Sequence, residues 1–317
     1  MRKCAVVLLV VALVALATGA GAQTYAERLG YPAGAKVLLI HCDDAGMSWS
    51  STLGAQQAIE RGVVTSTSIM APCPWVPMMA AWVKDHPQVD VGAHLAMTSE
   101  HDNYRWGPVA GRSAVPGLTD PNGCLWDNVG LVTEHASADE IEAEMRAQIA
   151  RLESYGITLT HIDTHMGTLY ARPDYAMRYI KVGIEKGLPV MAFAHLDSGD
   201  IPEEQWPAFQ ALMKQVWDGG LPVLDNMMND PYGTPVPDKK AAFIKLIKEM
   251  KPGVNYLLVH CAVPSAEQVS VNGLDTASRW MADLECMTAP EIRQLLKDEG
   301  VIMTTWRELK ARRAKAK

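Results

Sequence analysis

The chain has 317 residues, with 29 Lys and Arg against 36 Asp and Glu, so its formal net charge is −7, and 48% of its residues are hydrophobic. Disordered chains have fewer apolar residues and more charge, so this composition indicates a globular protein. An acidic chain also argues against a nucleic-acid-binding surface. Its one basic run, at 310–317, is expected to be a solvated helix end.

The first 22 residues have the pattern of a signal peptide that is removed from the mature protein. Arg2 and Lys3 precede an uninterrupted apolar run at 5–17, and Ala20-Gly21-Ala22 forms an A-x-A cleavage signal. Because a membrane span needs about 20 apolar residues, the run is short for an anchor, although an uncleaved anchor is the alternative. We therefore expect an exported mature chain, periplasmic or secreted, with no membrane span after cleavage.

Five cysteines follow residue 22, without a C-x-x-C motif or the spacing of a disulfide scaffold. An odd number in an oxidising compartment leaves at least one thiol free or paired between chains. Cys42 and Cys261 adjoin polar strand ends, where they could be taken for metal ligands. We expect them instead to be small buried hydrophobic side chains.

Short apolar runs alternate with helix patterns along the rest of the chain. Runs typical of strands buried in a parallel sheet lie at 37–42, 64–70, 89–94, 159–164, 189–193, 222–224, 256–260 and 301–304. Helix patterns lie at 51–60, 77–84, 137–155, 172–187, 238–249 and 288–300. This alternation favours an α/β fold, a single distorted (β/α) barrel of the TIM type, with 23–317 as one domain. No G-x-G-x-x-G follows the first strand, which argues against a dinucleotide-binding fold.

Two connections, at 96–136 and 261–287, interrupt the alternation and are expected to form long loops at the C-terminal rim of the barrel. Structureless connections longer than about 15 residues are usually functional or disordered. The first contains Trp106 and Trp126, whose aromatic faces suit sugar rings. The alternative is that both tryptophans only fasten the loop to the barrel.

Two adjacent carboxylates, Asp43 and Asp44, follow the first expected strand. At the end of a buried strand such a pair is unfavourable unless a positive group lies beside it. A divalent metal ion satisfies this requirement if one Asp ligates it and the other accepts a proton from a bound water. A solvated Asp-Gly turn is the alternative.

Histidines end three further expected strands. His94 ends the third, although a lone histidine there is more often a satisfied core residue than a ligand. In the fourth strand His161, Asp163 and His165 alternate and therefore share one face. Asp163 is well placed to orient a metal-binding histidine. The seventh strand ends at His260.

Catalytic residues of β/α barrels come from the ends of several strands at one rim, so these strand ends are expected to form a single site. One carboxylate with two imidazoles makes the facial triad of a catalytic divalent ion and leaves positions open for water and substrate. Two imidazoles favour zinc or another late transition ion over magnesium.

Taken together and in this order, the motifs resemble those of the YdjC-type (ChbG/HpnK-like) carbohydrate deacetylases, relatives of the polysaccharide deacetylases. The matching pieces are Asp43-Asp44-x-Gly46, Gly92-Ala93-His94-Leu95, His161-Ile162-Asp163-Thr164-His165, Val259-His260 and the closing Arg279…Leu284…Gly300-Val301 pattern. The resemblance covers 36–309, nearly the whole chain after residue 22. It implies a distorted β/α barrel that removes acetyl groups from an N- or O-acetylated carbohydrate.

Carried over residue by residue, the resemblance implies one divalent ion bound by Asp44, His94 and His165, with Asp43 as general base and His260 as acid. Members of the family are often described with Mg²⁺, so Zn²⁺ and Mg²⁺ are both expected candidates. The chain departs from the family pattern at Met166-Gly167-Thr168, where further histidines are common, at Ala45, usually Phe, and at Cys261, usually Pro. These departures leave the expected metal ligands in place, but the identity of the sugar is undetermined.

The expected partner is an acetylated mono- or oligosaccharide. The residues expected around the site, behind the ligands or against substrate, are Asp163, His161, Trp106, Trp126 and Arg279, with Asn226 and Asp230 as further candidates for substrate contact.

Three other functions were weighed against this one. Another metal-dependent barrel hydrolase, an amidohydrolase or a phosphoesterase, would use the same ligand types, but amidohydrolases usually begin with H-x-H where this chain has His41-Cys42-Asp43. An exported sugar-binding protein without catalysis would leave the paired Asp unexplained. A serine hydrolase is disfavoured because the chain has no G-x-S-x-G elbow.

Overall fold

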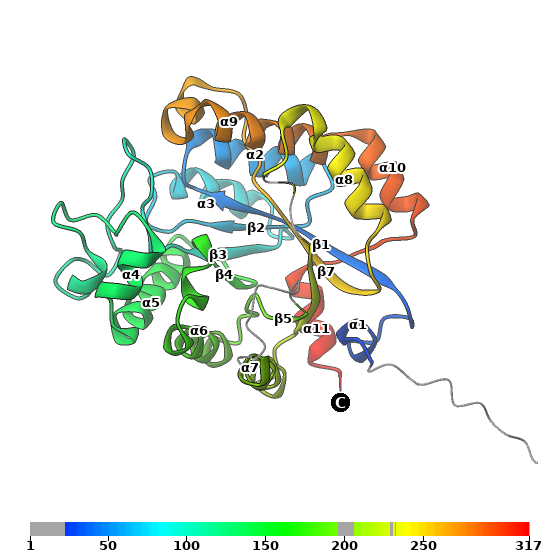
Figure 1. Cartoon of the computed structure of the whole chain (residues 1–317), viewed down its shortest axis with the longest axis horizontal. Helices are drawn as coiled ribbons and strands as arrows, with labels where there is room; N and C mark the ends of the chain where they lie inside the picture. The colour runs from blue at the N-terminus through cyan, green and yellow to red at the C-terminus, as the bar shows by residue number, and fades with distance from the viewer. Residues whose placement is uncertain (1–22, 196–205, 229–230, 232, 317) are drawn as a thin grey trace, which may run out of the picture.

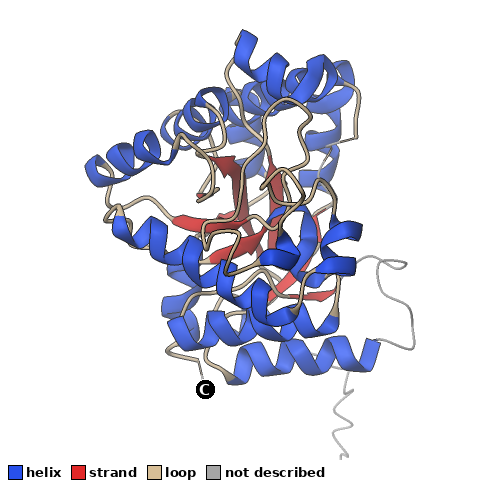
Figure 2. Cartoon of the chain, turned by 90° about the vertical axis from the view of Figure 1, so that its left-hand side faces the viewer, coloured by secondary structure: helices blue, strands red, loops and turns tan. Residues whose placement is uncertain are grey.

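The computed structural model describes residues 23–195, 206–228, 231 and 233–316, so the expected signal peptide lies outside the described residues. The chain curls one sheet of parallel strands into a half-barrel and covers it with helices (Figures 1 and 2). The strands are β1 (Lys36–Ala45), β2 (Ser66–Ile69), β3 (Val91–Leu95), β4 (Ile162–Thr164), β5 (Phe193–His195), β6 (Leu224–Met228), β7 (Gly253–Val259) and β8 (Ile302–Met303).

The strands follow the order β4-β3-β2-β1-β7-β6-β5, and β8 pairs with β1. One isolated parallel bridge, between Ile162 and Val190, links the two ends of this order. A complete TIM barrel has a full ladder at that place, whereas the described residues show this single bridge. The expected α/β fold with alternating strands and helices is therefore confirmed as a curled half-barrel.

All eight expected strands are present, with shifted ends. The largest differences are at β1, which continues through both aspartates to Ala45, and at β5 and β6, which begin later than expected. The apolar start of β1 is fully buried, and β1 pairs in parallel with β2, β7 and β8, which is why its sequence shows no polar face.

The helices pack outside the sheet, and Figure 1 shows α2, α8, α9 and α10 on one side of it and α5, α6 and α7 on the other. Their bounds are α1 (Tyr25–Arg28), α2 (Trp49–Glu60), α3 (Val76–Asp85), α4 (Val129–His135), α5 (Ala138–Ser154), α6 (Pro173–Lys186), α7 (Trp206–Asp218), α8 (Lys239–Lys248), α9 (Ala266–Thr288), α10 (Pro290–Asp298) and α11 (Trp306–Arg313). The six expected helices are confirmed, and the basic run at 310–317 begins in α11, as expected.

The expectation of a long loop at 261–287 is wrong, because helix α9 occupies most of it. Gly273, with φ 73° and ψ 161°, kinks this helix and hides its periodicity in the sequence. The signal that could have found α9 is Ser265, whose side chain accepts a hydrogen bond from the backbone N–H of Gln268 as the N-cap of the helix.

The connection at 96–136 does hold long irregular segments, with α4 and a short 3₁₀ turn, Pro116–Leu118, as its regular parts. Side-chain hydrogen bonds fasten it to itself and to α5: the Trp106 indole donates to the carbonyl of Thr98, and Glu144 accepts from the backbone N–H groups of Val109 and Ala110. The loop is therefore an ordered wall beside the carboxyl ends of the strands.

Small side chains on β2 and β3 make room inside the half-barrel for polar residues of β1 and β4. Ser68 on β2 is in register with Gly92 on β3, and His94 on β3 is in register with Asp163 on β4. A Cβ atom added to Gly92 would lie 2.4 Å from Nε2 of His161. Position 92 therefore has to be glycine, because the imidazole of His161 packs against it.

Among the described residues, no helix is both long enough and apolar enough to cross a membrane. The five described cysteines are free thiols, and Cys42 and Cys261 are buried, as expected of small hydrophobic side chains.

Replacing Gly92 by Ala is expected to lower the free energy of unfolding by about 1–3 kcal/mol, because the new methyl group overlaps the His161 ring. Urea denaturation measures the change. Gly233→Ala is the control, since a Cβ atom there would have no atom within 4 Å. Equal stability of the two variants would contradict the close approach of Gly92 to His161.

Candidate metal centre

The end of β1 turns two neighbouring carboxylates toward one site. In a regular strand consecutive side chains point to opposite faces. Here the pairing with β2 changes register between Cys42 and Ala45, and Asp44 has φ 56°. Asp44 and Met166, which follows His165, are the two non-glycine residues with positive φ in the described chain. Such backbone costs about 1–3 kcal/mol per residue and is concentrated at functional sites.

Three buried ligand atoms from β1, β3 and the end of β4 form a compact triangle. Oδ1 of Asp44 lies 3.3 Å from Nε2 of His94 and 3.3 Å from Nδ1 of His165, and the two nitrogen atoms are 3.1 Å apart. Ligands bound at about 2.0–2.2 Å to one ion are separated by roughly 2.8–3.5 Å at octahedral or tetrahedral angles. The triangle therefore fits a single divalent ion without rearrangement.

The charges of the site also call for a cation. Burial opposes protonation of His165, but the carboxylates of Glu100 and Asp44 outweigh it and raise the pKa of His165 to about 10. Asp163, Asp44 and Asp43 likewise raise the pKa of His94 above its ordinary value, against the effect of burial. Without an ion, the buried carboxylates thus recruit protons onto the two imidazoles, and a metal ion can supply the same positive charge.

Each of the two imidazoles is oriented by a carboxylate on its far side. Nδ1 of His94 lies 2.8 Å from Oδ1 of Asp163, and Nε2 of His165 lies 2.8 Å from Oε1 of Glu100. Such partners fix which ring nitrogen carries the proton and leave the other free for the ion. Asp163 was predicted for this role, whereas Glu100 was missed, because it lies in the irregular connection and belongs to no motif.

Asp43 and His260 form an acid–base pair beside the triangle. Oδ1 of Asp43 lies 3.2 Å from Nε2 of His260. Burial, together with the neighbouring charge of Asp44, raises the pKa of Asp43 well above its ordinary value. Burial lowers the pKa of His260 to about 4. The indole of Trp280 stacks on the His260 ring at 5.0 Å between centroids and fixes its plane.

A cavity of about 600 Å³ opens above these groups. Its lining combines polar groups of the site with apolar side chains. The lining residues are Asp43, Asp44, Glu100, His101, Thr164, His165, Met166, Gly167, Met191, Met227, Leu258, His260, Asn272, Thr276 and Trp280. Asn272, Thr276 and Trp280 come from α9, so this wall was missed together with that helix.

The structure brings together all five residues that the family resemblance placed at the site: Asp43, Asp44, His94, His165 and His260.

The two tryptophans predicted to contact substrate lie at different distances from the site. Trp106 is buried behind His165, with its ring centroid 6.5 Å from that imidazole. Trp126 instead stacks on His135, donates to the Gly117 carbonyl and is outside the cavity lining. Both indoles donate to carbonyl groups of the same connection, so both tryptophans brace this loop internally.

Four other predicted residues lie outside the cavity lining or outside the described residues. Arg279 pairs with Asp275 along α9, and Asn226 donates a hydrogen bond to Asn255 within the sheet. His161 lies deeper in the barrel, stacked on Trp306 at 5.3 Å. Asp230 lies outside the described residues.

Comparison with known proteins places the chain in a family. The family model described as YdjC-like protein matches residues 37–298. The chain is 30% identical over 284 residues to a carbohydrate deacetylase of Thermus thermophilus, covering 90% of this chain and 97% of the relative. It is 26% identical to a carbohydrate deacetylase of Brevibacillus brevis, over 86% of this chain and 99% of that one.

A solved structure has the same fold. A protein of Enterococcus faecalis V583, described as a cellobiose-phosphate cleavage protein, superposes with a TM-score of 0.72 at 21% identity, covering 87% of this chain and 99% of the other. The family model and the carbohydrate deacetylase relatives define the class of this protein as YdjC-like. The chain belongs to this family.

The raised pKa of His165 predicts a pH dependence of stability in chain stripped of metal by a chelator. The folded-state pKa is about 10 against an ordinary 6.5, so this stabilisation is complete below pH 6.5 and is lost as the pH rises through 10. The urea midpoint of the stripped wild type should therefore fall more steeply over this range than that of His165→Gln. Parallel profiles for the two chains would contradict the assignment.

Proposed function

We propose that this protein is a metal-dependent carbohydrate deacetylase that hydrolyses the acetyl group of an acetylated sugar. The observation that carries the proposal is the juxtaposition of a metal-sized triangle of ligand atoms with the Asp43–His260 pair at the base of one cavity. The names of the relatives, which are carbohydrate deacetylases, support the reaction class.

Asp44, His94 and His165 would hold the ion through Oδ1, Nε2 and Nδ1. The chemistry that such an ion supplies when bound is polarisation of the acetyl carbonyl and a lowered pKa for a coordinated water. Zn²⁺ and Mg²⁺ are the two candidates, and the two imidazoles favour Zn²⁺. Asp163 and Glu100 keep the two imidazoles in the tautomers that present these nitrogen atoms.

The protein groups move one proton from water to the leaving group. Asp43 accepts the proton of the attacking water, whose oxygen forms the new bond to the acetyl carbon. Burial and Asp44 make the Asp43 carboxylate a stronger base than an exposed one. Because burial keeps His260 neutral before the reaction, we infer that the proton crosses the 3.2 Å from Asp43 to Nε2 of His260. His260 then protonates the leaving nitrogen or oxygen as its bond to carbon breaks, which yields acetate and the deacetylated sugar.

The cavity suits a sugar because a pyranose has polar edges and apolar C–H faces. Met166, Met191 and Met227 offer an apolar surface, while Asn272 and Thr276 offer an amide and a hydroxyl. The substrate class is therefore an acetylated mono- or oligosaccharide, with the acetyl group directed toward Asp43.

The cellular location of the protein is proposed from its sequence. The apolar run and cleavage signal of residues 1–22 support export to the periplasm or the medium, with 23–317 as the single enzymatic domain.

Replacing Asp43 by Asn tests the base. The variant should lose at least about 100-fold in kcat, the usual contribution of a general base, because an amide cannot accept the proton of the water. It should still bind the ion, since Asp43 is outside the ligand triangle. Acetate release and metal content measure the two effects. Retained activity would remove Asp43 from this role.

Replacing His94 by Ala tests the ligand set. The variant should lose metal and acetate release together, whereas Asp43→Asn loses only the second. Elemental analysis of the two purified variants shows which of them has lost the metal ion. Normal metal content in His94→Ala would contradict the assignment of His94 as a ligand.

A further inference from the structure

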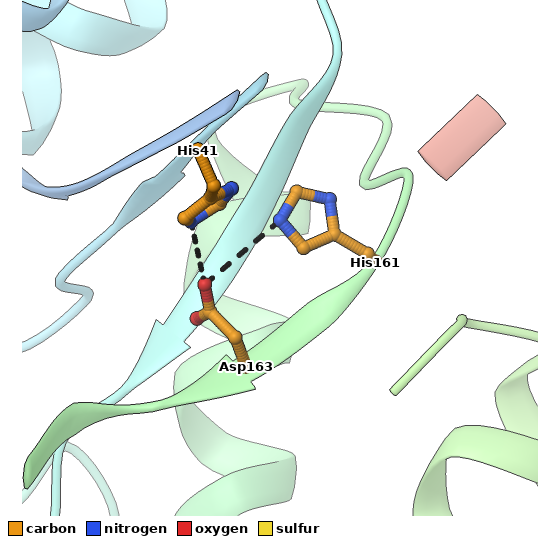
Figure 3. Close-up of side chains that lie close together, drawn as sticks. All are labelled: His41, His161 and Asp163. Atoms are coloured by element: carbon orange, nitrogen blue, oxygen red, sulfur yellow. Dashed lines mark ion pairs between the residues drawn. The ribbon is translucent and has the colours of Figure 1, made fainter. Parts of the chain in front are cut away.

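His41 lies on β1, two residues before Asp43, yet it is fully buried and outside the cavity lining. Its ring passes over β2, where only the short side chains of Ser66 and Ser68 stand between β1 and β3. In this way it reaches Asp163 on β4, three strands away in the order of the sheet (Figure 3).

The contact between His41 and Asp163 is short. Nε2 of His41 lies 2.7 Å from Oδ2 of Asp163 and 3.0 Å from Oγ of Ser68, and Nδ1 lies 3.1 Å from Oγ of Ser66. An imidazole lone pair would repel the carboxylate at this distance, so Nε2 is the ring nitrogen of His41 that carries a hydrogen. Its N–H is in hydrogen-bond geometry to Oγ of Ser68, and Oδ2 of Asp163 lies beside it in ion-pair contact.

The two oxygen atoms of Asp163 serve two different imidazoles. Oδ1 contacts Nδ1 of His94 at 2.8 Å, and Oδ2 contacts Nε2 of His41 at 2.7 Å. Asp163 is 1% exposed, so no water competes for either oxygen atom. The carboxylate is thus fixed between a residue that faces the ion and a residue that faces the core.

We propose that His41 is a positioning residue that acts through Asp163 on His94: it holds the carboxylate in the orientation that turns Nε2 of His94 toward the metal ion. This inference rests on the proposed function, because it assigns His41 a part in building the metal centre. The series of contacts from Ser66 through His41 and Asp163 to His94 extends the metal centre across four strands.

His161 belongs to the same cluster but is placed differently. Its Nε2 lies 4.0 Å from Oδ2 of Asp163, beyond hydrogen-bond distance, and has no hydrogen-bond partner among the described residues (Figure 3). Its Nδ1 pairs with the Thr160 hydroxyl, and its ring stacks on Trp306. We therefore assign His161 to packing, which makes it a matched control for His41.

The experiment compares the Zn²⁺ affinity of variants, measured by competition with a chromophoric chelator, together with their thermal unfolding. His41→Leu removes the donor and keeps the volume, and it should weaken Zn²⁺ binding about 10–100-fold, the effect usual for the residues that orient metal ligands. His161→Leu should keep wild-type affinity whatever it does to stability. His41→Gln, whose amide nitrogen reaches about as far as Nε2, should recover most of the lost affinity.

Two polar substitutions of His41, by Asn and by Gln, keep the test decisive if His41→Leu does not fold. His41→Asn places its amide nitrogen near the position of Nδ1, beside Ser66, and cannot reach Asp163, so it should bind Zn²⁺ more weakly than His41→Gln. Wild-type affinity in His41→Leu, equal losses in the His41 and His161 variants, or no difference between Asn and Gln would each overturn the inference. A wild-type chain that binds no divalent ion would overturn the proposed function as well, which distinguishes the two failures.

Discussion

The structure depends on how it keeps several carboxylates charged inside a half-barrel. Asp43, Asp44 and Asp163 are almost completely buried, and the charges of Asp44 and Asp163 both act on Asp43. Two imidazoles face them, and the charges favour protonation of both rings in the absence of a metal ion. A divalent ion would supply this positive charge while leaving the imidazoles neutral, so the electrostatics that make the site costly to fold also suit it to binding a metal ion.

The fold places these groups by the ends of its strands and by the small residues between them. A register change and a positive φ at the end of β1 turn both aspartates inward. Ser68 and Gly92 then leave space through which polar side chains of β1 and β4 meet. The result is a layered site, with ligand atoms at the surface of the cavity, carboxylates behind them and core imidazoles behind those.

The strands could be predicted from the sequence, and so could the gathering of Asp43, Asp44, His94, His165 and His260 at one rim, because apolar runs that end in chemically distinctive residues are visible in it. The roles of these five residues come from the family resemblance. The kinked helix α9 was missed because Gly273 breaks its periodicity and its remaining signal is the Ser265 N-cap. The cavity wall around Trp280 was missed with it. Glu100 was missed for a different reason: its contact with His165 joins residues that are 65 positions apart through an irregular loop. Neither local propensity nor a motif encodes such a contact. Trp126 was predicted as a sugar platform because it is an aromatic residue in a loop, whereas its indole donates to Gly117 within that loop and lies outside the cavity lining.

The central claim is that one ion held by Asp44, His94 and His165 makes this chain a deacetylase. The most direct test is the metal content of the purified chain from residue 23, with acetate release from chitin oligosaccharides measured before and after chelation. The account predicts one ion per chain, with acetate release that is lost on chelation and restored by adding Zn²⁺ or Mg²⁺. A chain that binds neither ion, or that releases acetate equally well after chelation, would contradict it.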